Sequence, residues 1–163
     1  MVLTLLLACA GTGSDDTGTP AIIPIGDPRY ERDPALDVDL ESTPGATISH
    51  NAGQSCQSCH QAHGPGRGLF TVAGTAYEAD GTLASAGSIR LWDGGPGVGN
   101  EVGVVPIDAY GNFYTTADMG YPDANLFPTV HDSEGTLVNA MPWPTTSGAC
   151  NHCHTPVKRV AFP

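Results

Sequence analysis

Glycine and proline recur along this chain so often that neither a long helix nor a long uninterrupted strand can form. The two residue types together account for 35 of 163 positions, with 21 glycines and 14 prolines. Proline ends helices and glycine favours turns, so this composition excludes a helical bundle. The hydrophobic share of 40% is nevertheless too high for a wholly disordered chain. We expect short strands joined by tight turns, in one compact domain with tails.

Six segments in the middle of the chain are rich in apolar or β-branched residues and are separated by turn-forming residues. Within two of them the apolar residues alternate, so that Ile89 and Leu91 face one side of a strand, as do Val102 and Val104. Short strands at this spacing are typical of an antiparallel β-sandwich, which we expect to span residues 69–138. The six predicted strands are 69–77, 88–92, 100–107, 111–115, 126–130 and 135–138.

The charge balance narrows the range of partners. Six Lys and Arg residues stand against 17 Asp and Glu, a net charge of −11, which argues against binding of nucleic acid or of anionic lipid headgroups. No apolar run approaches the roughly 20 residues that a membrane-spanning helix needs. We therefore expect no nucleic-acid partner, and an association with a membrane only through a lipid anchor.

The first residues are similar to a secretory signal followed by a lipid anchor. Apolar residues 1–8 end in a small residue before Cys9, as at the end of a signal peptide. Leu6-Leu7-Ala8-Cys9 resembles the bacterial lipobox, in which the cysteine is lipidated, although no basic residue precedes it. Residues 9–45 are rich in Thr, Asp, Pro and Gly and predict a disordered tether. The expected product is an exported, outer-membrane-anchored lipoprotein that is periplasmic or on the cell surface.

The pattern Cys-x-x-Cys-His occurs twice, at residues 56–60 and 150–154. It is the attachment signature of c-type haem, because two thiols at this spacing can each bond one porphyrin edge carbon and place the following histidine under the iron. We therefore expect two covalently bound haem c groups, held by the segments 46–68 and 139–163. The thioether-forming residues would be Cys56, Cys59, Cys150 and Cys153, and the proximal iron ligands would be His60 and His154.

The four cysteines also allow other chemistry. Four thiolates can hold one zinc ion in a tetrahedral site, but about 90 residues separate the two pairs and both histidines would then have no role. Two disulfides or a thiol-redox function are the remaining alternatives. The histidine that follows each pair favours haem over all three.

The second, distal ligand of each iron is left open among five residues. His50 is favoured for the first haem, since six extended residues reach about 20 Å and can pass around the porphyrin edge. His63 lies on the proximal side of the first haem and His152 lies within its own attachment loop, so each could serve only the other haem. A methionine ligand would raise the reduction potential relative to two histidines. The five candidates are His50, His63, His131, His152 and Met141.

Three segments resemble the carboxypeptidase regulatory-like, or transthyretin-like, β-sandwich: Val72–Tyr77, Ala86–Leu91 and Ala109–Tyr114. Cytochrome-like lipoproteins of some environmental bacteria flank such a sandwich with Cys-x-x-Cys-His motifs, and the resemblance covers about residues 48–163. It implies a mainly β, non-catalytic scaffold for two haems, that is, a dihaem c-type cytochrome lipoprotein.

Such a protein would carry single electrons between redox partners outside the cytoplasm. Closing the sandwich can bring its two ends together, so we expect a closely spaced and partly exposed haem pair. The partners would be redox proteins or copies of the chain itself, which would meet through exposed haem edges. The alternatives are a dihaem peroxidase-like enzyme and a structural or carbohydrate-binding adhesin with haem or zinc as a staple.

Overall fold

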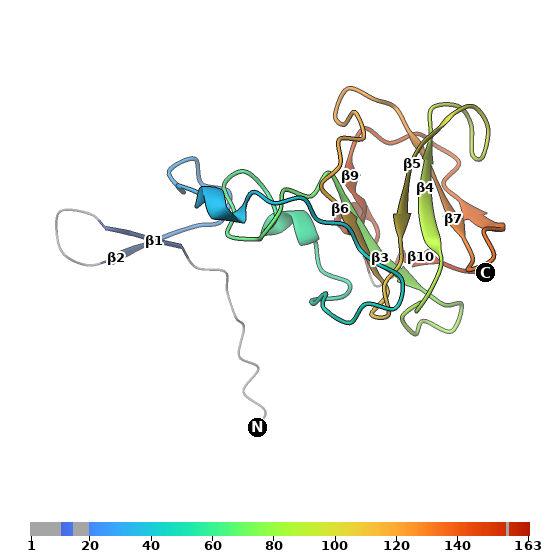
Figure 1. Ribbon diagram of the computed structural model, residues 1–163, viewed down its shortest axis with the longest axis horizontal. Helices are drawn as coiled ribbons and strands as arrows, with labels where there is room; N and C mark the ends of the chain where they lie inside the picture. The colour runs from blue at the N-terminus through green and yellow to red at the C-terminus, as the bar shows by residue number, and fades with distance from the viewer. Residues whose placement is uncertain (1–10, 15–19, 156) are drawn as a thin grey trace. The chain divides into compact units, whose positions relative to one another are not determined.

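The computed structural model describes residues 11–14, 20–155 and 157–163 and divides into two compact units (Figure 1). The smaller unit comprises residues up to Val38 together with Gln57–Leu69, and the larger comprises Asp39–Cys56 together with Phe70–Pro163. The boundary between the units therefore falls inside the first Cys-x-x-Cys-His motif, directly after Cys56. The second motif belongs entirely to the larger unit.

The larger unit is a β-sandwich of two four-stranded sheets. In the first sheet β6 pairs antiparallel with one edge of β3, while β9 and β10 pair parallel with the other edge. The second sheet has the order β5-β4-β7-β8 and is antiparallel throughout. The first sheet contains β3 (Val72–Tyr77), β6 (Asn112–Thr115), β9 (Gly148–Ala149) and β10 (Val160–Ala161). The second contains β4 (Ser88–Trp92), β5 (Glu101–Pro106), β7 (Phe127–His131) and β8 (Leu137–Ala140).

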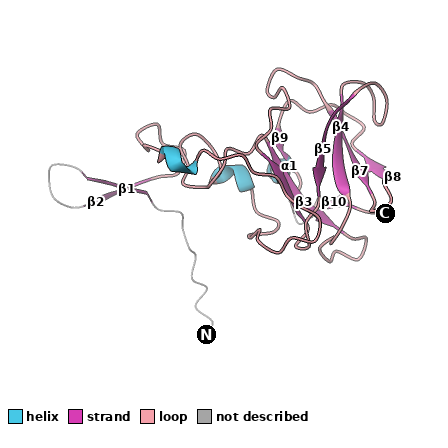
Figure 2. Ribbon diagram, in the orientation of Figure 1, coloured by secondary structure: helices cyan, strands magenta, loops and turns pink. Residues whose placement is uncertain are grey.

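Each of the six predicted strands corresponds to one of these elements, which confirms the mainly β class and the sandwich architecture (Figure 2). The alternation predicted for β4 is also confirmed, since Ile89 and Leu91 are only 2% and 1% exposed. The few helical segments are short. Among the described residues, none of the helices is both long and apolar enough to cross a bilayer.

The predicted inward face of β5 is wrong by one residue. Val105 pairs with Ile89 of β4 and Gly103 pairs with Leu91, and directly paired residues lie on the same face of a sheet. Val102, in contrast, is 41% exposed. The sequence fits two alternations here, and the pairing with β4 selects the one that buries Val105.

The core lies between the two sheets. Phe113 of β6 and Val72 of β3 are fully buried from one sheet, and Leu91 and Val105 are buried from the other. Burial of each such side chain stabilises the fold by roughly 1.5–3 kcal/mol. The sandwich therefore has a hydrophobic core of its own, formed by residues of its two sheets.

The second Cys-x-x-Cys-His motif interrupts one edge of the first sheet. β9 pairs with the start of β3 and β10 with its end, and between them the chain forms the short helix α1 (Cys150–Cys153). Opposite this gap the backbone N–H of Thr75 donates to the side-chain Oδ1 of Asn151 over 3.0 Å. The segment 139–163, expected only as a haem-binding segment, thus also supplies strands β9 and β10 to the sandwich.

The segment 9–45, expected as a disordered tether, differs from that expectation in its described part. Ser42 and Leu40 run along the free edge of β6, where the Ser42 N–H donates to the Tyr114 oxygen over 2.8 Å and the Thr116 N–H donates to the Leu40 oxygen over 2.9 Å. A pairing this short leaves no periodicity in the sequence. Earlier elements are β1 (Gly11–Ser14), which pairs with β2 (Pro20–Ile23), and the 3-10 helix η1 (Pro34–Leu36). The expected signal segment 1–8 and Cys9 lie outside the described residues.

Candidate functional site

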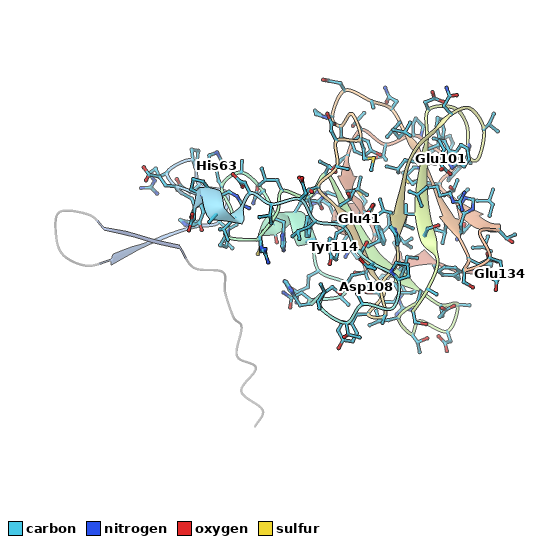
Figure 3. All side chains as sticks on the ribbon, viewed as in Figure 1. Glu41, His63, Glu101, Asp108, Tyr114 and Glu134 are labelled. Atoms are coloured by element: carbon cyan, nitrogen blue, oxygen red, sulfur yellow. The ribbon has the colours of Figure 1, made fainter. Side chains whose placement is uncertain are left out.

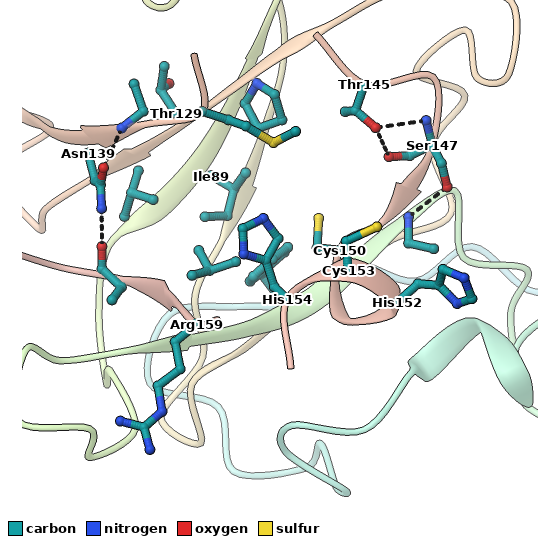
Figure 4. A pocket seen from close by; sticks show the side chains of 18 of the residues that line it. Ile89, Thr129, Asn139, Thr145, Ser147, Cys150, His152, Cys153, His154 and Arg159 are labelled. Atoms are coloured by element: carbon teal, nitrogen blue, oxygen red, sulfur yellow. Dashed lines mark hydrogen bonds between the residues drawn. The ribbon is translucent and has the colours of Figure 1, made fainter. Parts of the chain in front are cut away.

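The helix α1 presents the second motif beside the interior of the sandwich. Cys150 and Cys153 are three residues apart and therefore lie on the same face of the helical turn, which ends where the His154 N–H donates to the Cys150 oxygen over 2.8 Å. In Figure 4 the two sulfur atoms and the His154 ring lie on one side of α1, whereas the His152 ring projects away from His154. The three groups expected to hold a haem are thus grouped together.

The ring of His154 is fixed in one tautomer. Its Nδ1 lies 3.0 Å from the backbone oxygen of Lys158, and because a carbonyl oxygen can only accept, Nδ1 must carry the proton. The lone pair is then on Nε2, the nitrogen that points away from this contact. Histidines that bind metals are held in the same manner, by donation of the other ring N–H to a backbone carbonyl or carboxylate.

An open pocket of about 260 Å³ lies next to α1, with walls from both sheets. Its lining is mostly apolar and includes Ile89, Phe113 and Val160, together with Cys150 and His154. Pockets that enclose drug-sized ligands measure roughly 300–1,000 Å³. A porphyrin attached to α1 would therefore find apolar walls on its inner part while its outer part stayed exposed.

Met141 is the distal candidate that lines this pocket from the β8 side. It follows the last residue of β8, and its backbone N–H donates to the Pro128 oxygen over 3.0 Å, which fixes its position relative to β7. Met141 and His154 therefore approach the same space from different elements. His152 also contributes to the lining, but it is exposed.

His131 is built into the second sheet and not into the pocket lining. It is 5% exposed, its Nδ1 lies 3.0 Å from the Gly135 oxygen and its Nε2 lies 3.0 Å from the Thr129 hydroxyl. Both ring nitrogens are therefore engaged within the β7–β8 hairpin. This arrangement gives His131 a structural role.

The end of the first motif, Cys59 and His60, is folded against a glycine-rich loop within the smaller unit. The Gly66 N–H donates to the Cys59 oxygen over 2.9 Å, and a Cβ atom at Gly66 would lie only 2.7 Å from Cγ of His60. This close approach brings the Arg67 oxygen to 2.8 Å from His60 Nδ1. His60 thus carries its lone pair on Nε2, the same tautomer as His154.

The two remaining distal candidates lie in different units. His50 is an exposed residue of the larger unit, and its backbone oxygen accepts from Nδ2 of Asn112 over 3.3 Å. His63 belongs to the smaller unit and is exposed (Figure 3), and its backbone oxygen accepts from the Gly26 N–H over 2.8 Å. Neither position lies on the pocket beside α1.

The first cysteine of each motif has a thiol that is hard to ionise. Burial raises the pKa of Cys56. Burial also raises the pKa of Cys150 to about 12, with smaller contributions from the neighbouring thiols of Cys56 and Cys153. Cysteines of thiol–disulfide enzymes have a lowered pKa instead, so these thiols do not favour the thiol-redox alternative. The influence of Cys56 on Cys150 also indicates that these two residues of the larger unit lie near each other.

A buried polar network joins the chain just before Cys56 to the helix α1. Asn151 is 7% exposed and Thr75 is fully buried, and the side chain of Asn151 bonds both to Thr75 and to the oxygen of Gln54, two residues before Cys56. Sequence reasoning missed these residues, because a polar residue between two cysteines, or one in a strand, fits many roles. It also missed the carbonyl groups that hold the histidines, since a backbone group has no residue-type signal.

In comparisons with known proteins, no family model, curated protein or solved structure matches the chain. Within residues 11–14, 20–155 and 157–163, no group of three or more His, Cys, Asp or Glu side chains is gathered as a metal site formed by the protein alone. The arrangement that the chain does provide is a cysteine pair with an oriented histidine, present twice.

Proposed function

We propose that this protein is an exported dihaem c-type cytochrome that carries single electrons between redox partners. The observation that supports this most strongly is the matched state of the two motif histidines. His60 and His154 each donate Nδ1–H to a backbone oxygen, from Arg67 and Lys158, although the two loops differ in length and sequence. In each motif this donation leaves Nε2 as the ring nitrogen that would bind iron, and it holds the ring in one orientation.

The residues fit the group that they would hold. Cys150 and Cys153 would form thioethers on one face of α1, His154 would be the proximal ligand, and the apolar pocket would cover part of the ring. Cys56, Cys59 and His60 would play the same roles in the first motif. When bound, the haem iron supplies the chemistry by alternating between its ferric and ferrous states.

For the distal ligands, the positions favour Met141 for the second haem. Met141 lines the same pocket as His154, whereas His131 has both ring nitrogens engaged and His152 projects away. For the first haem His50 remains the preferred ligand, and His63 is the alternative. Arg159 also lines the pocket, and its guanidinium lies 5.2 Å from the centre of the Tyr77 ring.

Partial exposure of the haem suits electron exchange better than substrate binding, because a partner can approach its edge directly. The net charge of −11 would steer cationic partner surfaces towards the protein in a salt-sensitive manner, and copies of the chain could meet through the same edges. The lipid anchor at Cys9 would hold the protein at the outer membrane, on the periplasmic or the cell-surface side.

The test is a measurement of haem content. The full-length protein, expressed in a host with a c-type maturation system, should be red, have an intact mass increased by two haem groups, and give two haems per chain in a pyridine haemochrome assay. Variants with both cysteines of one motif changed to alanine should carry one haem each. A colourless protein with the mass of the bare polypeptide, with or without lipid, would contradict the proposal.

A further inference from the structure

The geometry around Asn151 points to a positioning role: we infer that this side chain fixes the position of Cys56 relative to Cys150, the first attachment cysteine of each haem, and so constrains the electronic coupling between the two haems. This inference rests on the proposed function and adds to it a residue that positions the two attachment cysteines. All the contacts that carry it lie within the larger unit.

Asn151 uses its whole amide group in this contact. Its Oδ1 accepts from the Thr75 N–H over 3.0 Å, and its Nδ2 donates to the Gln54 oxygen over 2.7 Å and to the Thr75 hydroxyl over 3.0 Å. Both amide protons and the amide oxygen are thus engaged in a residue that is 7% exposed. Any other rotamer would leave a buried polar group unpaired, which costs about 1–3 kcal/mol for each group.

One partner of Asn151 lies next to the first motif, whereas Asn151 itself lies within the second. Gln54 is two residues before Cys56, and its oxygen is also the acceptor for the Cys56 thiol at 3.7 Å. Asn151 itself directly follows Cys150. A single side chain therefore connects the backbone next to the first cysteine of one motif with the backbone next to the first cysteine of the other.

Thr75 anchors this connection to the sheet. Its hydroxyl accepts from the Gly53 N–H over 2.8 Å as well as from Asn151, and it donates to Oδ1 of Asn112 over 2.8 Å. The Asn112 amide in turn donates to the Ser49 hydroxyl over 2.9 Å. The hydroxyl of Thr75 has no unused hydrogen-bonding capacity, and a fully satisfied buried network of this kind holds its members in one arrangement.

The role in spacing explains why this network replaces backbone pairing. In a continuous edge strand the Thr75 N–H would donate to a backbone oxygen. No side chain would then connect the segment before Cys56 to residues 150–153. With Asn151 in that position, the sheet fixes α1 and the 49–54 segment together. The thioether bonds formed at Cys56 and Cys150 would therefore keep a constant spacing.

The experiment compares haem-loaded variants by circular dichroism in the Soret region, where two haems held close together give a paired positive and negative band. The variants are Asn151→Ala, Thr75→Val, their combination, and Asn100→Ala as the matched control. Asn100 also uses its side-chain amide in a hydrogen bond, to Asp93 over 2.9 Å, but lies in an exposed hairpin loop outside the network. Haem content is measured in every sample by pyridine haemochrome.

We expect two haems per chain in all samples, a paired band in the unaltered protein and in Asn100→Ala, and a band at least halved in Asn151→Ala and Thr75→Val. The combined variant should lose little more than the larger single change, because both residues act in one network. Two haems with an undiminished band in Asn151→Ala would overturn the inference, as would two haems without a paired band in the unaltered protein; both results leave the cytochrome proposal intact.

If Asn151→Ala cannot be recovered with two haems, the paired band of Thr75→Val tests the inference instead, because that change keeps the buried volume. If neither variant retains two haems, the network serves folding or attachment and the inference is wrong. A protein without any haem would instead refute the proposed function, so the two failures are distinguished by haem content alone.

Discussion

Nδ1 of His154 lies 3.0 Å from the backbone oxygen of Lys158, four residues further along the chain. The contact orients the imidazole within the pocket wall and leaves the lone pair on Nε2. His152, which lies within α1 two residues before His154, projects to another side. His154 is therefore oriented towards the space beside the cysteines and His152 is not. The two histidines provide a matched pair for mutagenesis.

Replacement of His154 by alanine should leave two haems per chain, because the thioethers of Cys150 and Cys153 do not need the imidazole. One of the two haems should change from a low-spin to a high-spin absorption spectrum, since it has lost its proximal ligand. His152→Ala should leave the spectrum unchanged. Absorption and electron paramagnetic resonance spectra provide the measurement, and an altered spectrum only in His152→Ala would contradict the assignment.

The loop that holds the first histidine can be tested at Gly66. A Cβ there would lie 2.7 Å from His60 Cγ and 2.8 Å from the Cys59 oxygen, so Gly66→Ala must move the loop away from the histidine. We expect heterogeneous ligation of the first haem and a free energy of unfolding lowered by about 1–3 kcal/mol. Gly95→Ala, at a glycine with open space around its Cβ position, is the control and should alter neither spectrum nor stability noticeably.

Met141→His tests the distal position of the second haem. Methionine ligation raises the potential of a haem relative to histidine ligation, so the change should lower one of the two potentials by a sizeable part of the roughly 0.8 V range that axial ligands span. The near-infrared band typical of a methionine–iron bond should disappear from the oxidised protein. A spectrum of the unaltered protein that already lacks this band would exclude Met141 as a ligand.

His131 should affect stability and not the haem spectrum. Its two ring nitrogens bond to the Gly135 oxygen and the Thr129 hydroxyl inside a hairpin, so His131→Leu removes both hydrogen bonds. We expect a loss of about 1–3 kcal/mol in the free energy of unfolding, measured by denaturant titration. Glu78→Gln, at an exposed position, should stay within about 0.5 kcal/mol of the unaltered protein.

The pH dependence of stability should differ between haem-free and haem-loaded protein. Burial raises the pKa of the Cys150 thiol from 9.0 to about 12, so the folded state retains a proton that the unfolded state has lost in this range. The haem-free protein should therefore lose stability as the pH rises above 9, by an amount on the order of a few kcal/mol.

The haem-loaded protein should not show this loss, because a thioether sulfur does not titrate. Denaturant unfolding on either side of pH 9 measures the difference, and Cys150→Ala in the haem-free protein should reduce the alkaline loss. The same alkaline loss in the haem-loaded protein would mean that Cys150 is not attached.

Local sequence patterns predicted most strands of the sandwich. In β4, for example, the apolar residues Ile89 and Leu91 occupy alternate positions, and these two are the residues that the structure buries. The face of β5 could not be predicted, since residues 102, 104, 105 and 107 are all apolar and only pairing with β4 distinguishes the two faces. Strands β9 and β10 have two residues each, too few for any periodicity.

The candidate site was predictable where it depends on residue type and unpredictable where it depends on backbone and tertiary contacts. The cysteines and histidines of the motifs are evident from their spacing. The carbonyl of Lys158, the location of Met141 on the pocket and the contact between Asn151 and Thr75 arise only when β3, β8 and α1 are folded together.

The break in the sheet edge at α1 has a further consequence for solubility. An uninterrupted edge strand exposes a row of unpaired N–H and C=O groups, to which the strand of another molecule can add, and this is a common route to aggregation. Here β9 and β10 cover the two ends of β3, and the Asn151 side chain satisfies the Thr75 N–H between them. The helical turn that carries the two thiols thereby also shields this edge of the first sheet from neighbouring chains.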